Sequence, residues 1–243
     1  MPFTISHPAI VLPLAYLPRK WVSLTGLVVG SLTPDFEYFL RVKMKSIHSH
    51  TFEGLFWFDL PVGLVLAFVF HNIVRNALFD NLPDVVKSRI MVFKGFSWNT
   101  YFKKNWLVVV VSILVGASSH IFWDSFTHYH GYFVQQILAL SDSIALFNLQ
   151  IPIYRALQHI STLVGAVIIA ISIYKLPISK DETKRVDVKF WIALVGITLA
   201  IISIKFLFGL KLKEYGDVIV TIISAGLFGL VLVPLLLYRG NNI

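Results

Sequence analysis

Long apolar runs separated by short polar connections occupy most of the chain. The clearest cover residues 160–178, 190–210 and 218–237, and each is close to the ~20 residues that cross a hydrocarbon core of roughly 30 Å. Two further runs cover residues 55–78 and 106–125. The pattern predicts an all-α, polytopic membrane helical bundle with about five transmembrane helices.

The first apolar stretch has a different organisation, because Pro18-Arg19-Lys20 interrupts it. Two short helices, over residues 5–17 and 21–32, fit better than one span, since each is about 18 Å long and too short to cross a bilayer comfortably. A helical hairpin brings its two outer ends together. It would therefore place His7 beside Asp35.

Composition supports a membrane protein and limits the other classes. Of the 243 residues, 56% are hydrophobic and 14% are charged, against roughly 45–50% and roughly 25% in soluble domains. The net charge of +8 is better explained by cytoplasmic loops than by nucleic acid, for which we expect no binding. We expect one membrane domain, in which residues 1–175 form the functional bundle and residues 176–243 form an anchoring transmembrane hairpin.

The distribution of basic residues predicts an orientation in the membrane. The connection 80–104 is rich in Lys and Arg and is therefore expected to be cytoplasmic, so the span 106–125 runs outward. The basic connection 175–189 agrees, whereas Lys211 and Lys213 are mildly against this orientation. We expect a multi-pass protein of the inner, or plasma, membrane.

Candidate chemistry is concentrated at the end of the span 106–125. His120, Asp124 and His128 are spaced four residues apart, so a continuous helix places them along one face. Ionisable groups at such a position are costly and usually face the bundle interior or a water-filled cavity. Because the chain has no cysteine, any bound metal must be held by imidazole and carboxylate groups.

With the N-terminal hairpin entering from outside, nine acids and imidazoles fall at one membrane face. These are His7, Asp35, His48, His50, Asp59, His120, Asp124, His128 and His159. A lone histidine often serves only interhelical hydrogen bonding, and His71, deep in its span, is interpreted in that way. Spacing cannot decide between His48 and His50. Asp59, His48 and His159 are candidates for supporting the ligands, whereas Glu37 and Glu53 are interpreted as solvated acids and His130 as an ordinary loop residue.

Four motifs taken in order resemble a known family. They are Ser6-His7-Pro8, the segment Gly30-Ser31-Leu32-Thr33-Pro34-Asp35-Phe36, His50-Thr51 followed by Gly54, and His120-Ile121-Phe122-Trp123-Asp124-Ser125-Phe126-Thr127-His128. Over residues 2–170 the chain resembles an uncharacterised family of bacterial integral membrane proteins, itself similar to the membrane-bound metal-dependent hydrolases of the inner membrane. The motif order is also distantly similar to the zinc-dependent phospholipase C fold.

The resemblance implies a set of metal ligands. They would be His7, Asp35, His50, His120 and Asp124, with His128 as a sixth candidate. Two features depart from the pattern, since no later histidine begins a His-x-x-x-Glu pair and Glu37 stands where the hydrolases often have a second Asp. One or two divalent ions, with Zn²⁺ favoured, are therefore expected.

These observations predict a membrane-embedded metal-dependent hydrolase acting on a lipid or lipid-linked phosphoester at the external face. Asp35 or Asp124 would bridge the ions or act as general base. The alternatives are a structural or regulatory protein with a structural metal site, and an ion or small-solute transporter. The chain has no phosphate-binding glycine loop and no serine-hydrolase elbow. The substrate and the oligomeric state stay open.

Overall fold

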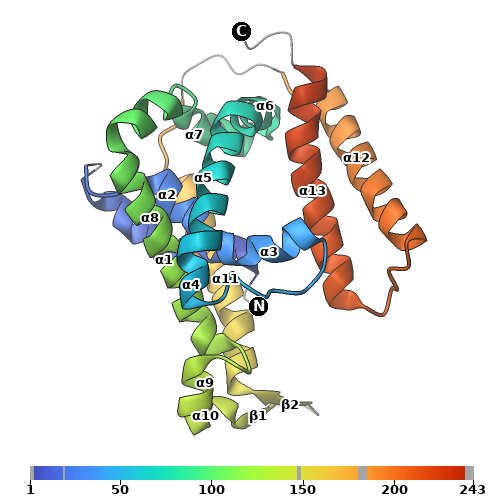
Figure 1. The fold of residues 1–243 in the computed structure, drawn as a ribbon. Helices are drawn as coiled ribbons and strands as arrows, with labels where there is room; N and C mark the ends of the chain where they lie inside the picture. Colours follow the sequence, from blue (N-terminus) through green and yellow to red (C-terminus); the bar gives the residue numbers. More distant parts are fainter. Residues whose placement is uncertain (1–2, 19, 147–148, 180–184, 239–243) are drawn as a thin grey trace. The chain divides into compact units, whose positions relative to one another are not determined.

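A computed structural model describes residues 3–18, 20–146, 149–179 and 185–238 of the chain (Figure 1). It is 76% helical and confirms the predicted all-α membrane bundle. Arg19 of the predicted turn and residues 180–184 of the predicted basic connection lie outside the described residues. Five helical segments in the described part are long and apolar enough to cross a membrane: Phe52–Asn81, Trp98–Gln136, Ile153–Tyr174, Val188–Leu207 and Tyr215–Leu237.

The chain divides into two compact units whose segments alternate along the sequence. The first comprises residues 1–35, 48–64 and 104–172, and the second comprises residues 36–47, 65–103 and 173–243. The predicted separation of a functional bundle, 1–175, from an anchor, 176–243, concerns roles and stays a prediction. Each unit is described by itself.

The first unit begins with the predicted N-terminal hairpin. A 3-10 turn, Thr4–Ser6, leads into α1, Pro8–Val11, and a second 3-10 segment, Leu12–Tyr16, follows. Proline suits the first turn of α1, where no N–H partner is needed, whereas the next proline falls where the tighter 3-10 geometry takes over. The returning arm is α2, Leu24–Gly30, and it packs against α1.

Helix α2 crosses helix α8, Trp98–Thr127, at backbone contact distance. A Cβ atom on Gly30 would lie 2.2 Å from the carbonyl oxygen of Ile113, and one on Gly116 would lie 2.4 Å from that of Leu27. Ile113 and Leu27 are themselves buried in the core of this unit. Glycine is therefore required at the crossing, because any side chain would push the two helices apart.

The rest of the first unit connects and covers this crossing. Helix α3, Thr33–Arg41, follows α2 after a short turn and begins in this unit, and α4, Phe52–Gly54, continues through a π-helical turn, Leu55–Asp59, into α5, Leu60–Val69. After residue 129 the chain forms two short helices and a β-hairpin. These are α9, Tyr132–Gln136, α10, Leu138–Ser141, β1, Ser143–Leu146, and β2, Leu149–Pro152, which leads into α11, Ile153–Tyr174.

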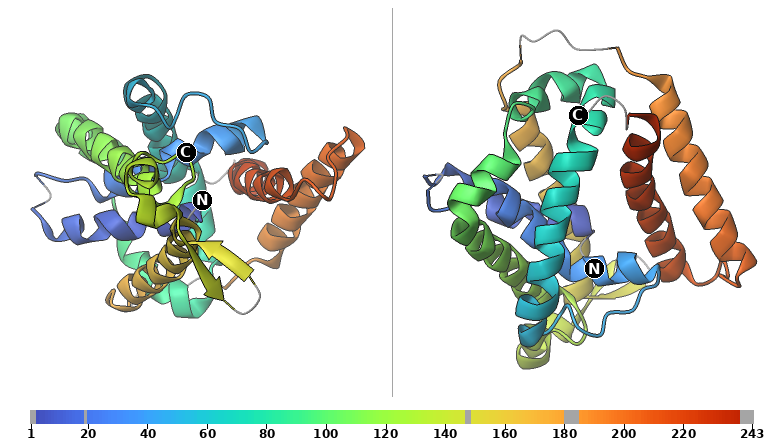
Figure 2. Two further views of the ribbon diagram at one scale, coloured as in Figure 1. Left: turned by 90° about the horizontal axis from the view of Figure 1, so that it is seen from below. Right: turned by 45° about the horizontal axis from the view of Figure 1, so that its top comes forward.

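The second unit contains the other turns and the last two spans. A π-helical turn, Phe70–Val74, precedes α6, Arg75–Asn81, α7, Asp84–Ile90, and a 3-10 turn, Met91–Phe93. The predicted loop 80–104 is thus largely helical, and α8 begins at Trp98 with a kink at Asn105 (φ −131°), just before the predicted start of the span. Helices α12, Val188–Leu207, and α13, Tyr215–Leu237, pack side by side (Figure 2).

The burial of Glu37 in this unit contradicts the sequence prediction. Glu37 was expected to be solvated, but it is 1% exposed. Its carboxylate accepts hydrogen bonds from Arg41 Nε at 2.8 Å, Ser46 Oγ at 3.1 Å and the Ile47 backbone N–H at 3.0 Å. Glu37 therefore closes the loop after α3, since one buried carboxylate holds donors from both sides of it.

The helix crossing generates a stability prediction. Substitution Gly30→Ala should lower the free energy of unfolding by about 1–3 kcal/mol, because the new methyl group meets backbone rather than a movable side chain. The matched control is Gly196→Ala in α12, where nothing lies within 4 Å of the added Cβ atom. Thermal unfolding in detergent measures both variants, and equal midpoints would contradict the proposed role of the crossing.

Candidate metal centre

The site is built on the last turns of α8. The helix is continuous to Thr127, so His120 and Asp124 lie one turn apart on one face, with His128 just beyond the end. His120 Nε2 lies 3.3 Å from Asp124 Oδ2, and His128 Nδ1 lies 3.6 Å from Asp124 Oδ1. His120 is fully buried and Asp124 is 6% exposed. The predicted stacking of these three side chains follows from the helical period.

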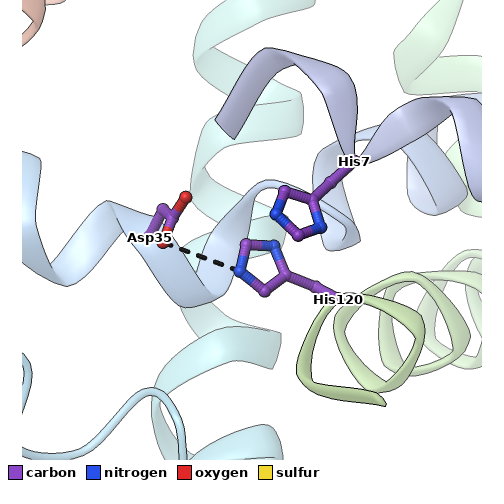
Figure 3. Close-up of side chains that lie close together, drawn as sticks. All are labelled: His7, Asp35 and His120. Carbon is purple, nitrogen blue, oxygen red and sulfur yellow. Dashed lines mark ion pairs between the residues drawn. The ribbon is translucent and has the colours of Figure 1, made fainter. Parts of the chain in front are cut away.

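His7 reaches the same place from the N-terminal hairpin. It precedes Pro8, the first residue of α1, and its ring stacks on the His120 ring with centroids 3.6 Å apart and an interplanar angle of 11° (Figure 3). Its Nε2 atom lies 3.6 Å from Asp124 Oδ1. The hairpin therefore joins a residue near the start of the chain to the end of α8.

Asp35 lies in the first turn of α3 and is fully buried. Its Oδ2 atom accepts a hydrogen bond from Thr4 Oγ1 at 2.5 Å, which ties α3 to the N-terminal segment. Its Oδ1 atom lies 3.6 Å from His120 Nε2, the pair marked in Figure 3. The hairpin thus brings Asp35 close to His7, as the interrupted apolar stretch predicts.

His50 completes the cluster from the segment before α4. Its Nε2 atom lies 3.7 Å from Asp35 Oδ1 and 3.7 Å from Asp124 Oδ2, so it faces both carboxylates. Its side chain is 25% exposed. His48 instead packs edge-on against Trp57, with ring centroids 4.6 Å apart. Of the two candidates that spacing could not separate, His50 joins the cluster.

Hydrogen bonds outside the cluster fix the tautomers of two imidazoles. His120 Nδ1 lies 2.7 Å from the Ser31 carbonyl oxygen, which can only accept, so Nδ1 carries the proton. The Ser49 hydroxyl donates to the Pro34 carbonyl at 2.6 Å and must therefore accept from His50 Nδ1 at 3.1 Å. Both rings consequently turn an Nε2 atom toward the carboxylates, and a backbone or hydroxyl partner on the other nitrogen is typical of metal-bound histidine.

The cluster leaves several buried polar atoms unsatisfied. His120 Nε2, Asp35 Oδ1 and Asp124 Oδ1 have no hydrogen-bond partner among the described residues. The lone pair of a neutral imidazole facing a carboxylate oxygen is repulsive, so the pair requires a positive charge between them, either a proton on Nε2 or a metal ion in its place. Two groups have ligand atoms within 4.8 Å of one another: His7, Asp35 and His120, and His50, His120 and Asp124. Imidazole nitrogens and carboxylate oxygens are common metal ligands, so these residues fit a divalent metal ion.

The ionisation of His7 and Asp35, which lie outside the spans, fits the same role. Burial lowers the pKa of His7 to about 3, and the adjacent His120 contributes in the same direction, so His7 is neutral at pH 7. Burial alone would raise the pKa of Asp35, but the His120 side chain and the Thr4 hydroxyl outweigh it and hold this pKa below its ordinary value. A neutral imidazole and an ionised carboxylate are the forms that bind metal.

The remaining candidates lie at the edge of the cluster or outside it. His128 is 31% exposed in its side chain, and its Nδ1 atom lies 3.1 Å from the Asp124 carbonyl oxygen, outside both ligand groups. His159 is exposed on α11. Asp59 is fully buried in the π-helical turn of the first unit, and its supporting role stays a prediction. Neither His48 nor His159 belongs to a ligand group.

Three supporting groups were missed in the sequence: Thr4, Ser49 and the Ser31 carbonyl. The position of Ser49 next to His50 is a usable signal, because a neighbouring hydroxyl can hold an imidazole. A backbone carbonyl carries no such signal, since every residue has one.

Fold and site together define a polytopic membrane protein with a buried cluster of histidine and aspartate. The chain belongs to the family described as Domain of unknown function (DUF4184), whose model matches residues 1–235. No curated protein and no solved structure matches the chain. The family and the membrane helices agree with the predicted resemblance to an uncharacterised membrane family. The predicted likeness to hydrolases and to the phospholipase C fold stays a prediction.

Metal content is the first prediction from this geometry. The purified protein should carry at least about one divalent ion per chain, and His120→Ala or Asp124→Ala should lose most of it, because either change removes a central ligand. His130→Ala is the control, since His130 is exposed. Elemental analysis of the purified proteins measures the ratio, and a wild type without stoichiometric metal would refute the site.

The hydroxyl of Thr4 supplies a second prediction. Thr4→Val keeps the shape of the side chain but removes the donor to Asp35, and should weaken metal affinity roughly 10–100-fold. Thr4→Ser keeps the hydroxyl and should restore the affinity. Competition with a chromophoric chelator gives the affinities, and equal values for the Val and Ser variants would contradict this role of the hydroxyl.

Proposed function

We propose that the protein is a membrane-embedded metal-dependent hydrolase acting on a lipid or lipid-linked phosphoester. The observation that carries this proposal is the pair of imidazoles, His50 and His120, whose Nε2 atoms face Asp35 and Asp124 while their other nitrogens are held from outside. Imidazoles that are already oriented before an ion binds are expected at a catalytic metal site, where the ligand geometry controls the reaction.

An accessible side supports catalysis over a purely structural ion. The cluster is closed at His7, Asp35 and His120, each no more than 4% exposed. It opens at His50 and His128, whose side chains are 25% and 31% exposed. Catalytic metal sites keep a position for water or substrate, whereas structural sites are closed.

The two carboxylates suit different roles. When bound, a divalent ion supplies a Lewis acid that makes water nucleophilic near neutral pH and polarises a phosphoryl oxygen. Asp35 is fully buried and partly engaged by Thr4, so we assign it to holding the ion. Asp124 lies next to the open side and has an oxygen without a hydrogen-bond partner, so we assign it the role of general base.

His128 is placed to serve the leaving group. Its Nδ1 atom is held by the Asp124 carbonyl oxygen at 3.1 Å, and its Nε2 atom has no hydrogen-bond partner among the described residues. The side chain lies at the open edge of the cluster, where a leaving alkoxide would emerge. The neutral ring carries its one proton on Nδ1, so Nε2 must first take up a proton from solvent, and we assign this imidazolium form to protonating the alkoxide.

The position of the cluster along the spans supports a lipid substrate. His50 lies just before the span Phe52–Asn81, and Asp124 lies in the later part of the span Trp98–Gln136. A site at headgroup depth lets a phosphoester reach the cluster while acyl or prenyl tails stay in the bilayer. The positive-inside rule, applied to the basic connection 80–104, supports assigning this face to the external side of the inner membrane.

A structural metal site is the second candidate. It is favoured by the innermost group, His7, Asp35 and His120, which is closed to solvent and draws on three separate segments. An ion bound by that group alone would pin the N-terminal hairpin to α8. The presence or absence of an exchangeable water in the metal coordination sphere distinguishes this case from an enzyme.

Hydrolysis provides the test of the proposal. The protein in lipid nanodiscs should release product from at least one member of a panel of phospholipids and polyprenyl phosphates, and a chelator should stop the release. Asp124→Asn should lower the rate at least roughly 100-fold, because the amide neither holds the ion as a carboxylate does nor accepts the proton. His130→Ala should retain the rate. Metal-loaded protein that releases no product from any substrate, or equal rates for wild type and Asp124→Asn, would refute catalysis at this cluster.

A further inference from the structure

A second polar site lies in the other unit and is independent of the metal cluster. A cavity of about 280 Å³ is lined by residues from the π-helical turn, the start of α6 and the start of α8. Its lining residues are His71, Asn72, Arg75, Asn76, Phe96, Ser97, Trp98 and Asn99. None of them is acidic, and Arg75 is the one permanent charge among them.

Arg75 is buried without a counterion. It is 8% exposed, and the described residues form no ion pair with it. Its Nη1 atom donates to the Phe96 carbonyl at 2.6 Å and its Nε atom to Asn76 Oδ1 at 3.1 Å. No described residue accepts from Nη2. A buried charge in a membrane helix normally pairs with an opposite charge, so this arrangement calls for an anion.

His71 does not neutralise the positive charge of Arg75. Its Nδ1 atom lies 3.1 Å from Arg75 Nη1, and because guanidinium can only donate, Nδ1 accepts and the imidazole is neutral. The ring stacks on Trp98 with centroids 4.7 Å apart and an interplanar angle of 6°. The stacked pair forms a rigid wall beside Arg75. His71 is thus the polar helix contact that its position in the span predicts.

The rim of the cavity offers neutral hydrogen-bonding groups. Asn72 and Asn99 are exposed and exchange amide hydrogen bonds at 3.3 and 3.2 Å. Each primary amide has a second N–H, and Ser97 adds a hydroxyl at the same rim. Arg75 follows a π-helical turn, a distortion that is frequent at functional sites because it re-aims side chains.

We propose that this cavity binds a phosphate-type anion, with Arg75 as its charge partner and the rim amides as neutral donors. Guanidinium donates charge-assisted hydrogen bonds to phosphate oxygens, and Nη2, which has no acceptor among the described residues, supplies the donors for them. The anion is either a free phosphate or phosphomonoester, or the headgroup of an anionic phospholipid, since the chemistry presented to the site is the same.

Two ligands distinguish these sources, with the full chain kept in a chelator so that the metal cluster cannot contribute. Radiolabelled inorganic phosphate is measured by equilibrium dialysis in a neutral detergent. Retained phosphatidic acid is measured by native mass spectrometry after exchange from mixed phosphatidylcholine and phosphatidic acid nanodiscs. Binding in the first assay assigns a soluble phosphate, and binding only in the second assigns a lipid headgroup.

Arg75→Gln should weaken whichever binding is observed by at least roughly tenfold, because a charge-assisted hydrogen bond is lost. Arg89→Gln is the matched control: Arg89 also donates to backbone carbonyls, those of Tyr174 and Leu176, but it does not line the cavity. The Arg89→Gln variant removes the same charge from the same unit and should bind phosphate or phosphatidic acid as the wild type does.

A second variant covers the case in which Arg75→Gln does not fold. Asn72→Leu leaves the hydrogen bonds of Arg75 in place and sets an apolar side chain at the rim, so it should also weaken binding. Absence of both ligands from the wild type, or equal weakening by the Arg75 and Arg89 variants, would overturn the proposal and leave Arg75 as a clamp on the Phe96 carbonyl.

Discussion

Direct backbone contact between α2 and α8 is the constraint on which the site depends. At Gly30 and Gly116 the helices touch without intervening side chains. The Ser31 carbonyl, one residue past Gly30, is consequently close enough to accept from His120 Nδ1 at 2.7 Å. The orientation of a central imidazole is therefore set by helix packing, and a wider crossing would release the ring and lose its tautomer.

The same packing explains how acids and imidazoles are tolerated in an apolar bundle. Burial of Asp35 and Asp124 is costly unless each is paired or hydrogen-bonded. Thr4 and the surrounding imidazoles supply part of that compensation, but Asp35 Oδ1 and Asp124 Oδ1 remain without hydrogen-bond partners among the described residues. The fold thus holds strongly polar atoms in an incompletely satisfied state, a condition typical of a binding site rather than of a structural core.

The sequence predicted the helical class and most of the cluster because both depend on local periodicity. The four-residue spacing of His120 and Asp124 defines one face of α8, and the Pro18 interruption predicts the hairpin that brings His7 to Asp35. The burial of Glu37 was missed, although Arg41 one helical turn later was a usable signal. The tautomers could not be foreseen, because they depend on contacts between segments distant in the sequence, as Ser31 and His120 are.

The order in which the ligands occur along the chain has a consequence for biogenesis. His7 leaves the ribosome long before Asp124, its partner at the end of α8, has been synthesised. The N-terminal hairpin therefore waits, without its partners, until the helix ending at Thr127 has been inserted. Capture of a cation by the cluster would then stabilise this half of the assembly only after α8 is in place.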